Sequence, residues 1–232
     1  MNLLALETST EACSVAVWRD GEVLERFEIA PRRHAELALP WAQALLAEAG
    51  LARTQLDAIA IGRGPGAFTG VRLGIALAQG IALGLDLPML PVSTLAALAM
   101  RAPQPGPVLA AIDARMGEVY AGAFMRSGDD VRALGAETVC APDAVELPAA
   151  EGAWQGMGTG FAAADAALRA RLAAQVPAVD AAALPRAADV ARLAARAWER
   201  GELVAPERVE PAYLRDNVAL TLEQQQALRS AR

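Results

Sequence analysis

The alternation of apolar and polar positions in the first thirty residues predicts three strands. Residues 2–6 are uniformly apolar, which is typical of a strand buried on both faces. Residues 12–18 alternate between apolar and small or polar side chains, which is typical of a half-buried neighbouring strand. Arg-Asp-Gly at residues 19–21 signals a hairpin turn, and residues 22–29 form the predicted returning strand.

The next stretch predicts a buried helix followed by alternating strands and helices. The first helix, at residues 34–49, is apolar nearly all round and is closed by Gly50, and we expect Pro40 to kink or shorten it. Ser93 is expected to cap the last helix of this half. The further predicted elements are a strand at 57–61, a glycine-rich loop at 62–70, a helix at 69–85, a strand at 87–90 and a helix at 93–100.

A proline-rich stretch at residues 102–107 is the best linker in the chain, because its three prolines and one glycine cannot continue a helix. We place a lobe boundary there, between residues 1–104 and a smaller C-terminal lobe with its tail, residues 105–232. Beyond it the opening pattern recurs, with predicted strands at 108–113, 118–125 and 131–139 and a turn at 127–130. This recurrence predicts an α/β protein with duplicated strand–turn–strand openings.

The rest of the second lobe reads as loops and helices. Residues 154–160 are glycine-rich and precede a predicted helix, and residues 177–185 predict a loop. Asp189 is expected to cap a helix that Gly201 ends. The polar tail after residue 215 is expected to fray.

The missing residue types exclude several kinds of catalytic site. All 21 basic residues are arginine, so a P-loop lysine, a Schiff-base lysine and a protein-kinase strand lysine are excluded. One histidine cannot build a two-histidine zinc site, and two cysteines cannot build a four-cysteine site. Cys13 and Cys140 are widely spaced, which suits a reduced cytosolic protein. We therefore expect no metal site.

The net charge and the hydropathy of the chain limit the kinds of partner that it can bind. The net charge of −6 argues against a chain that grips a nucleic-acid backbone or an anionic membrane by itself. The N-terminal residues lack the basic region and the long apolar stretch of a signal peptide. Residues 73–100 carry a single charge, at Asp86, but glycines and prolines interrupt them too often for a membrane span. We expect a cytoplasmic protein without a membrane partner.

Two turns and one loop carry candidate binding chemistry. A carboxylate with hydroxyls after the first strand could bind Mg²⁺ or phosphate, or could form an ordinary polar turn, and the turn at 113–115 has the same ambiguity. The amides of the glycine loop could bind phosphate, although Pro65 removes one; alternatively its glycines let another backbone approach closely. The candidate nucleotide-proximal residues are Glu7, Thr8, Ser9, Thr10, Gly64, Gly66, Asp113 and Arg115.

Small residues follow two lines along the helix at 69–85. Gly70, Gly74 and Ala78 recur at four-residue spacing, and Gly80 and Gly84 lie on another line. Each glycine inside a helix costs about 1 kcal/mol relative to alanine, which suggests a compensating close contact. That contact is either with the chain's own sheet or with a partner subunit, alongside the helix at 34–49. 

Two isolated reactive residues have ordinary explanations. His34 is expected to be a solvated cap or a satisfied polar contact, because no general base or nucleophile can be argued near it. Cys13 is expected to be a small core hydrophobe.

Several motifs together resemble the bacterial TsaB (YeaZ) family. The resemblance is carried by Leu-Ala-Leu-Glu-Thr-Ser-Thr-Glu-Ala-Cys-Ser-Val-Ala-Val at residues 4–17 and by Gly-Arg-Gly-Pro-Gly-Ala-Phe-Thr-Gly-Val-Arg-Leu-Gly at 62–74. Arg-His-Ala-Glu-Leu at 33–37, the turn at 113–115 with Glu-Val-Tyr at 118–120, and Pro-Ala-Tyr-Leu-Arg at 211–215 fit as well. The match is dense over residues 1–125 and thin afterwards.

The resemblance implies a two-lobed fold of the actin, Hsp70 and sugar-kinase type, which is ribonuclease-H-like. It also implies an accessory scaffold in the synthesis of N6-threonylcarbamoyladenosine at position 37 of tRNA. Such a subunit binds and activates the transferase TsaD, engages the ATPase TsaE, and meets tRNA only through the complex. A homodimer through the same face is expected when TsaD is absent. The implied interface residues are Leu37, Trp41, Leu45, Gly70, Gly74 and Ala78.

The resemblance further implies that the chain is not itself an enzyme and has no catalytic residues. TsaD holds its metal with the pair H-x-x-x-H, whereas the position four residues after His34 is Ala38. The phosphate turns of this fold usually include a glycine, and residues 8–10 have none, so ATP or ADP is expected only at the complex interface. The alternative is an autonomous ATPase or phosphotransferase of the same fold, working from the two acidic turns and residues 156–160. A protease is disfavoured, because no ligand set or nucleophile–base pair is visible.

Overall fold

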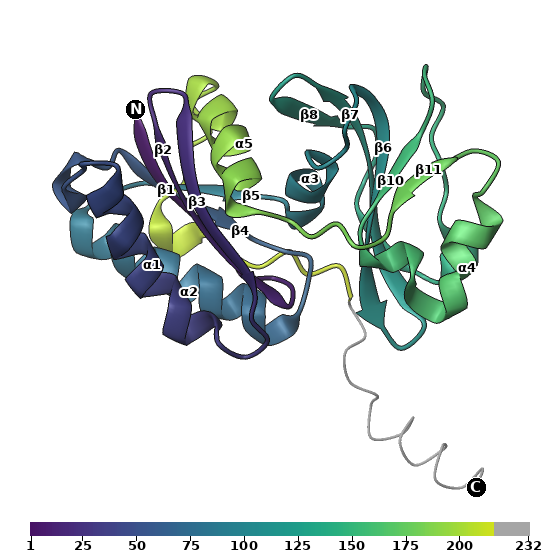
Figure 1. The fold of residues 1–232 in the computed structure, drawn as a ribbon, viewed down its shortest axis with the longest axis horizontal. Coiled ribbons are helices and arrows are strands. Elements are labelled where there is room, and N and C mark those ends of the chain that lie inside the picture. The colour runs from purple at the N-terminus through teal and green to yellow at the C-terminus, as the bar shows by residue number, and fades with distance from the viewer. Residues whose placement is uncertain (216–232) are drawn as a thin grey trace, which may run out of the picture.

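The computed structural model describes residues 1–215 as two β-sheets that lie side by side, each with helices packed on it (Figure 1). The strand order of the first sheet is β3-β2-β1-β4-β5, and that of the second is β11-β10-β6-β7-β8, with β9 paired to β7. The predicted α/β fold with two lobes is confirmed. The predicted fraying of the tail concerns residues 216–232, which lie outside the described residues.

The first sheet is built around β1, which pairs antiparallel with β2 and parallel with β4. Every residue of β1 after Asn2 is buried, as the uniformly apolar sequence predicts. The predicted strands of this sheet are confirmed to within two residues at each end. Its strands are β1 (Asn2–Glu7), β2 (Ala12–Arg19), β3 (Glu22–Ile29), β4 (Ala58–Gly62) and β5 (Met89–Val92).

Helices cover both faces of this sheet. α1 (His34–Glu48) and α2 (Phe68–Leu85) pack on one face, around a core that contains Leu4, Leu6 and Ile59. α5 (Ala187–Glu199) packs on the other face, where β1 contributes Leu3 and Ala5. Neighbouring residues of β1 thus enter opposite cores, because successive side chains of a strand point to opposite faces.

Of the helix signals in the first lobe, the shortening expected at Pro40 is wrong and the cap expected at Ser93 is confirmed. α1 continues through Pro40 for its full fifteen residues, so the expected shortening does not occur. Ser93 caps α3 (Thr94–Ala99) as predicted, because its Oγ accepts a hydrogen bond from the Ala96 amide at 3.2 Å.

The second sheet repeats the opening of the first, with β6 and β7 as an antiparallel pair followed by β8. The predicted strand at 131–139 is wrong, since two short strands, β8 and β9, stand in its place. β10 lies within the predicted glycine-rich loop and β11 within the predicted loop at 177–185. Strands of three or four residues are too short to show an alternating pattern. The strands are β6 (Gly106–Arg115), β7 (Glu118–Ser127), β8 (Asp130–Ala133), β9 (Thr138–Cys140), β10 (Gln155–Met157) and β11 (Ala178–Asp180).

The remaining elements are short. The helix α4 (Ala163–Arg171) covers the second sheet and contains left-handed backbone at residues 164–166. Four 3₁₀ turns complete the described chain: η1 (Arg53–Gln55), η2 (Pro142–Ala144), η3 (Thr159–Phe161) and η4 (Pro206–Arg208).

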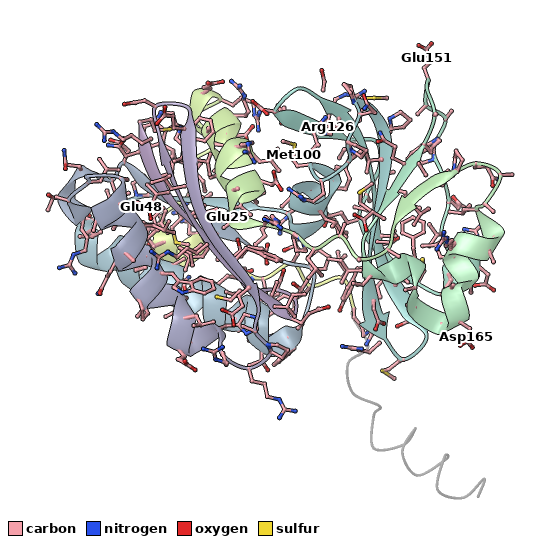
Figure 2. The ribbon with its side chains drawn as sticks, viewed as in Figure 1. Glu25, Glu48, Met100, Arg126, Glu151 and Asp165 are labelled. Carbon is pink, nitrogen blue, oxygen red and sulfur yellow. The ribbon has the colours of Figure 1, made fainter. Side chains whose placement is uncertain are left out.

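Although it follows the second sheet in sequence, α5 returns to the first. Its N-terminus is held by side chains of β2 and β3: Ser14 Oγ accepts from the Ala187 amide at 2.9 Å, and Glu25 Oε1 accepts from the Ala188 amide at 2.9 Å. Figure 2 shows Glu25 beside this end of α5. The predicted cap, Asp189, is wrong: it lies buried in the first turn and pairs with Arg192 at 2.8 Å and Arg101 at 3.5 Å.

By length and composition α2 is the one helix of the described chain that could cross a membrane, with a mean hydropathy of 1.5 over 18 residues. It packs against β4 and β1 through Val71, Gly74, Ile75, Ala78 and Ala82, as a helix that covers a sheet does. 

The Ser14 cap gives a test of how α5 is held. Ser14→Ala leaves the Ala187 amide without its buried acceptor, and loss of such a cap costs about 1 kcal/mol. We expect chemical denaturation to show this loss of stability. Ser127→Ala, at an exposed serine of β7, is the matched control and should leave the midpoint unchanged. Equal stability of the two variants would contradict the capping role.

Candidate functional site

The turn between β1 and β2 is buried beneath the glycine loop. Glu7, Thr8, Ser9 and Thr10 are all buried. The Ala67 amide donates to the Ser9 carbonyl oxygen at 2.7 Å, and Thr8 Oγ1 donates to the Gly70 carbonyl oxygen at 2.8 Å. The loop and the turn therefore form one packed unit.

The glycines of the loop are required by this packing. A Cβ on Gly66 would lie 2.4 Å from the Ser9 carbonyl oxygen, and one on Gly70 would lie 2.2 Å from that of Thr8. Both separations are well below van der Waals contact. Of the two uses that the sequence left open for these glycines, the close approach of another backbone is the one the structure displays.

The Glu7 carboxylate lies at the centre of this unit. Its Oε1 accepts hydrogen bonds from the Ser9 amide at 2.7 Å and from Ser9 Oγ, and its Oε2 accepts from Thr94 Oγ1 at 3.1 Å. Thr94 Oγ1 also accepts from the Gly64 amide at 3.1 Å. Burial raises the pKa of Glu7 and outweighs these hydrogen bonds, which lower it. A Cβ on Gly62 would overlap the carboxylate, so glycine is needed there too.

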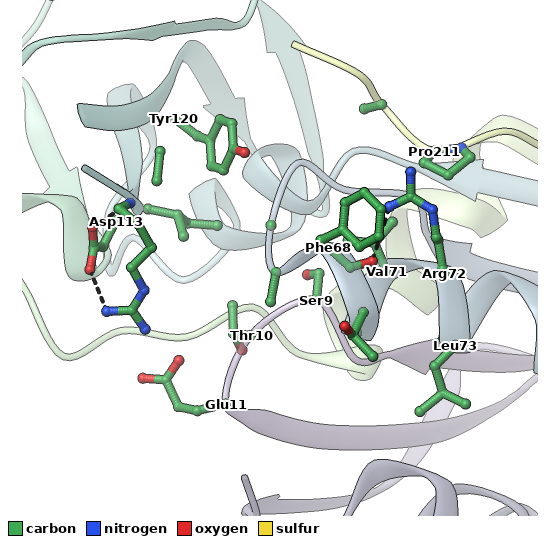
Figure 3. Close-up of a pocket in the computed structure, with 18 of the residues that line it drawn as sticks. Ser9, Thr10, Glu11, Phe68, Val71, Arg72, Leu73, Asp113, Tyr120 and Pro211 are labelled. Carbon is green, nitrogen blue, oxygen red and sulfur yellow. Dashed lines mark hydrogen bonds and ion pairs between the residues drawn. The ribbon is translucent and has the colours of Figure 1, made fainter. Parts of the chain in front are cut away.

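A cleft of about 1200 Å³ separates this unit from the second lobe (Figure 3). The end of β6 at residues 113–115 lies across it, where Asp113 Oδ2 accepts from Arg115 Nη1 at 2.9 Å. The turn predicted at these residues is formed instead by residues 116–117. The cleft brings together Ser9, Thr10, Gly66, Asp113 and Arg115 from the predicted nucleotide-proximal set. Glu7, Thr8 and Gly64 lie behind the turn and the loop and do not line it.

The sequence missed an aromatic and arginine cluster at the edge of the cleft. The Arg72 guanidinium lies 3.3 Å from the centre of the Phe68 ring and donates to Tyr213 Oη at 2.8 Å. Figure 3 shows Phe68 and Arg72 stacked beside Pro211. The sequence offered one indication of this cluster, the motif at residues 211–215. It could not show that this motif lies beside α2, because that contact forms only in the tertiary structure.

His34 and Cys13 have the ordinary roles that were predicted. His34 is buried, and its Nε2 lies 3.0 Å from the Thr10 carbonyl oxygen and 3.1 Å from that of Ala12, so Nε2 carries a proton and donates. Burial raises the pKa of the Cys13 thiol to about 11, with a smaller contribution from Glu28. In residues 1–215 there is no group of three or more His, Cys, Asp or Glu side chains that could hold a metal.

Most of the predicted interface residues lie in the chain's own core. Leu37, Leu45, Gly74 and Ala78 are buried against the sheet, and a Cβ on Gly74 would lie 2.3 Å from Thr8 Oγ1. Gly70 contacts the β1–β2 turn, and Trp41 is half-buried. The first line of small residues on α2 is therefore explained by the chain's own packing.

The second line is different. Among the described residues, a Cβ added to Gly80 or Gly84 would meet nothing within 4 Å, and both residues are exposed. Ala76 and Leu83 are exposed on the same helix. These four residues are called the outer face of α2 below.

Comparison with known proteins agrees with this architecture. A family model described as TsaD, tRNA N6-adenosine threonylcarbamoyltransferase, matches residues 27–222. A TsaB protein of Escherichia coli is 44% identical over 94% of this chain and 96% of its own length. This chain belongs to the TsaB family. A TsaB protein of Haemophilus influenzae is 40% identical, over 94% of this chain and 95% of its own length.

Solved structures of the TsaB family have the same fold. YeaZ from Pseudomonas aeruginosa is 46% identical, with a TM-score of 0.82 over 92% of this chain and 99% of that one. Another structure, described as an uncharacterized protein with similarity to peptidase YeaZ, is 47% identical, with a TM-score of 0.83 over the same shares. The curated TsaB relatives are named tRNA threonylcarbamoyladenosine biosynthesis proteins.

Alanine substitution separates the two lines of small residues on α2. Gly70→Ala places a methyl group against the Thr8 carbonyl oxygen and should destabilise the protein by about 1–3 kcal/mol. Gly80→Ala, in open space on the same helix, should stabilise it by up to about 1 kcal/mol. Urea denaturation measures both. A stable Gly70→Ala variant would mean that the loop does not press on the turn.

The buried Glu7 carboxyl predicts a pH dependence. Because its pKa is higher in the folded protein than its usual value of 4.5, the folded state holds this proton more tightly than the unfolded state does. The contribution of Glu7 to stability is greatest below pH 4.5 and falls as the pH rises toward the raised pKa.

Glu7→Gln should remove this fall while it retains a hydrogen-bonding side chain. We expect its stability, relative to that of the unmodified chain, to improve as the pH rises above 4.5. Denaturation at several pH values checks this, with Glu11→Gln as the exposed control from the same turn. A constant difference across the pH range would contradict the raised pKa.

Proposed function

We propose that this chain is a non-catalytic subunit in the synthesis of N6-threonylcarbamoyladenosine at position 37 of tRNA. In this role it binds and activates the transferase TsaD and engages the ATPase TsaE. The pathway follows from the names of its TsaB relatives. The observation that carries the partner role is the outer face of α2.

The outer face of α2 is apolar and smooth. No charged side chain occurs between Leu73 and Leu85, and Leu83 is 62% exposed. Gly80 and Gly84 each cost about 1 kcal/mol relative to alanine in a helix, and within residues 1–215 nothing lies within 4 Å of the place that a Cβ would occupy on either of them. Small residues at four-residue spacing allow another helix to approach closely, so a partner helix would explain both glycines.

α1 extends this surface. It lies beside α2 on the same face of the first sheet (Figure 1), and its Leu39 is exposed. Two neighbouring helices with exposed apolar residues form the kind of patch that marks a protein interface. TsaD is the proposed occupant in the complex, and a second copy of this chain is the proposed occupant when TsaD is absent.

The packed turn supports the non-catalytic role. The acidic turn would have to present Glu7 to a phosphate or metal in an autonomous phosphotransferase, but Glu7 and Thr8 lie behind the glycine loop, and only Ser9 and Thr10 of this turn line the cleft. The single histidine is engaged with two backbone carbonyls. We propose that the chain binds no nucleotide by itself, that ATP or ADP is held only at the interface of the complex, and that it works in the cytoplasm.

A reconstituted reaction tests this role. Purified TsaD, TsaE, the adenylate-forming enzyme, tRNA, ATP, threonine and bicarbonate are combined with and without this chain. We expect tRNA modification only when both this chain and TsaD are present. Equal modification without the chain would overturn the proposal. Calorimetry with ATP and Mg²⁺ would then test the alternative, an autonomous ATPase or phosphotransferase working from the cleft.

Substitution of Gly80 tests the surface itself. Gly80→Leu should leave the fold intact, because the added side chain enters open space. In the complex, the leucine side chain should overfill a close helix contact, at a cost of about 1–3 kcal/mol in binding free energy. This cost should weaken the complex with TsaD about tenfold or more. Sedimentation of the mixture and tRNA modification both report this loss, while circular dichroism confirms the fold.

Two control variants show whether a loss of binding comes from the outer face of α2. Gly80→Ala adds only a methyl group and should retain more of the binding than Gly80→Leu. Gly74→Leu should unfold or destabilise the chain, since its side chain would enter the space of Thr8. Unweakened binding of TsaD by folded Gly80→Leu would exclude this face as the interface.

A further inference from the structure

We propose that residues 209–215 form a clasp that holds the two lobes together at the mouth of the cleft and so sets its width. This segment includes the Pro-Ala-Tyr-Leu-Arg motif at 211–215, to which the partner role assigns no task. It is anchored at one end to the first lobe and at the other to the second. The inference concerns the isolated chain and does not depend on the proposed partner role.

The first-lobe end of the clasp is held along α2 and the glycine loop. Val209 is buried in the core beneath α1 and α2, and its carbonyl oxygen accepts from Gln79 Nε2 at 3.2 Å. The Ala212 amide donates to the Arg63 carbonyl oxygen at 2.9 Å. Tyr213 Oη accepts from Arg72 at 2.8 Å. These contacts fix the segment against the first lobe as far as residue 213.

The second-lobe end is held by one side chain. Arg215 forms an ion pair with Glu118 and donates to the Ala114 carbonyl oxygen at 3.3 Å. Both acceptors belong to the β6–β7 hairpin, and residues 113–115 at the end of β6 form the far wall of the cleft. Arg215 therefore connects the cleft wall of the second lobe to a segment that is fixed on the first.

The clasp lies where it can limit a rotation of one lobe relative to the other. The lobes also share a hydrophobic core, in which α3 packs on α5 and on β6 and β7. Beside this core, Arg200, which follows α5, forms an ion pair with Asp130 at 3.3 Å. In Figure 1 these contacts lie on one side of the molecule, and the last described residues cross between the lobes on the other. A link far from the other contacts limits a rotation about them more than a link close to them does.

The Arg215–Glu118 pair is the part of the clasp that can be released without disturbing the first-lobe anchors. Its side chains are 22% and 37% exposed, so both can be replaced without a buried charge being left behind. Reversing one charge makes the pair repulsive, and reversing both restores the attraction. This charge swap distinguishes the ion pair from a general effect of mutation.

The test measures the distance between the lobes by pulsed electron–electron double resonance. Spin labels are attached to Gln43→Cys on α1 and Arg169→Cys on α4, both exposed, in a Cys140→Ser background in which Cys13 remains buried. The labelled chain is diluted with unlabelled chain, so that only distances within one molecule are recorded. Arg215→Glu is compared with Arg208→Ala, which removes an exposed arginine from the same segment before the clasp begins.

We expect Arg215→Glu to shift the distance distribution to longer values and broaden it, and Arg208→Ala to leave it unchanged. The double variant Glu118→Arg, Arg215→Glu should return it to that of the unmodified chain. The Ala212 amide should keep its protection from hydrogen exchange in all of them, because the first-lobe anchors remain. An unchanged distribution in Arg215→Glu, or a double variant that fails to restore it, would overturn the clasp.

Discussion

The close approach of the glycine loop to the β1–β2 turn is the contact on which the rest of the molecule depends. Four glycines, at residues 62, 66, 70 and 74, lie where a Cβ would overlap the turn or the buried Glu7 carboxylate. Their absence of side chains lets β4, α2 and the start of α3 meet the turn through backbone and hydroxyl groups. A packed interior tolerates little change of volume, so this contact fixes how α2 lies on the sheet.

That orientation divides the small residues of α2 between two tasks. Gly74 and Ala78 face the chain's own core, and Gly80 and Gly84 face outward. The inward residues are explained by the packing of the described chain. The outward ones form the surface proposed above for a partner helix, in a family whose curated members are named for one pathway of tRNA modification.

After the second lobe, two segments of the chain return to the first lobe and hold the two lobes together. α5 returns to cover the far face of the first sheet, where Ser14 and Glu25 hold its N-terminus. The final described residues then run along α2 and reach the β6–β7 hairpin through Arg215. A cleft remains between the lobes, and Ser9 and Thr10 of the β1–β2 turn line it, but the Glu7 carboxylate lies behind the chain's own glycine loop.

The sequence by itself determined the elements of the first sheet and the family. Uniformly apolar β1, alternating β2 and the hairpin signal at residues 19–21 are local patterns, and local patterns report which face of an element is buried. They could not report which of two small-residue lines on α2 faces the core, nor that Glu25 rather than Asp189 holds the start of α5, nor that Tyr213 lies against Arg72. Those facts depend on contacts between residues far apart in the chain, and only the tertiary structure brings such residues together.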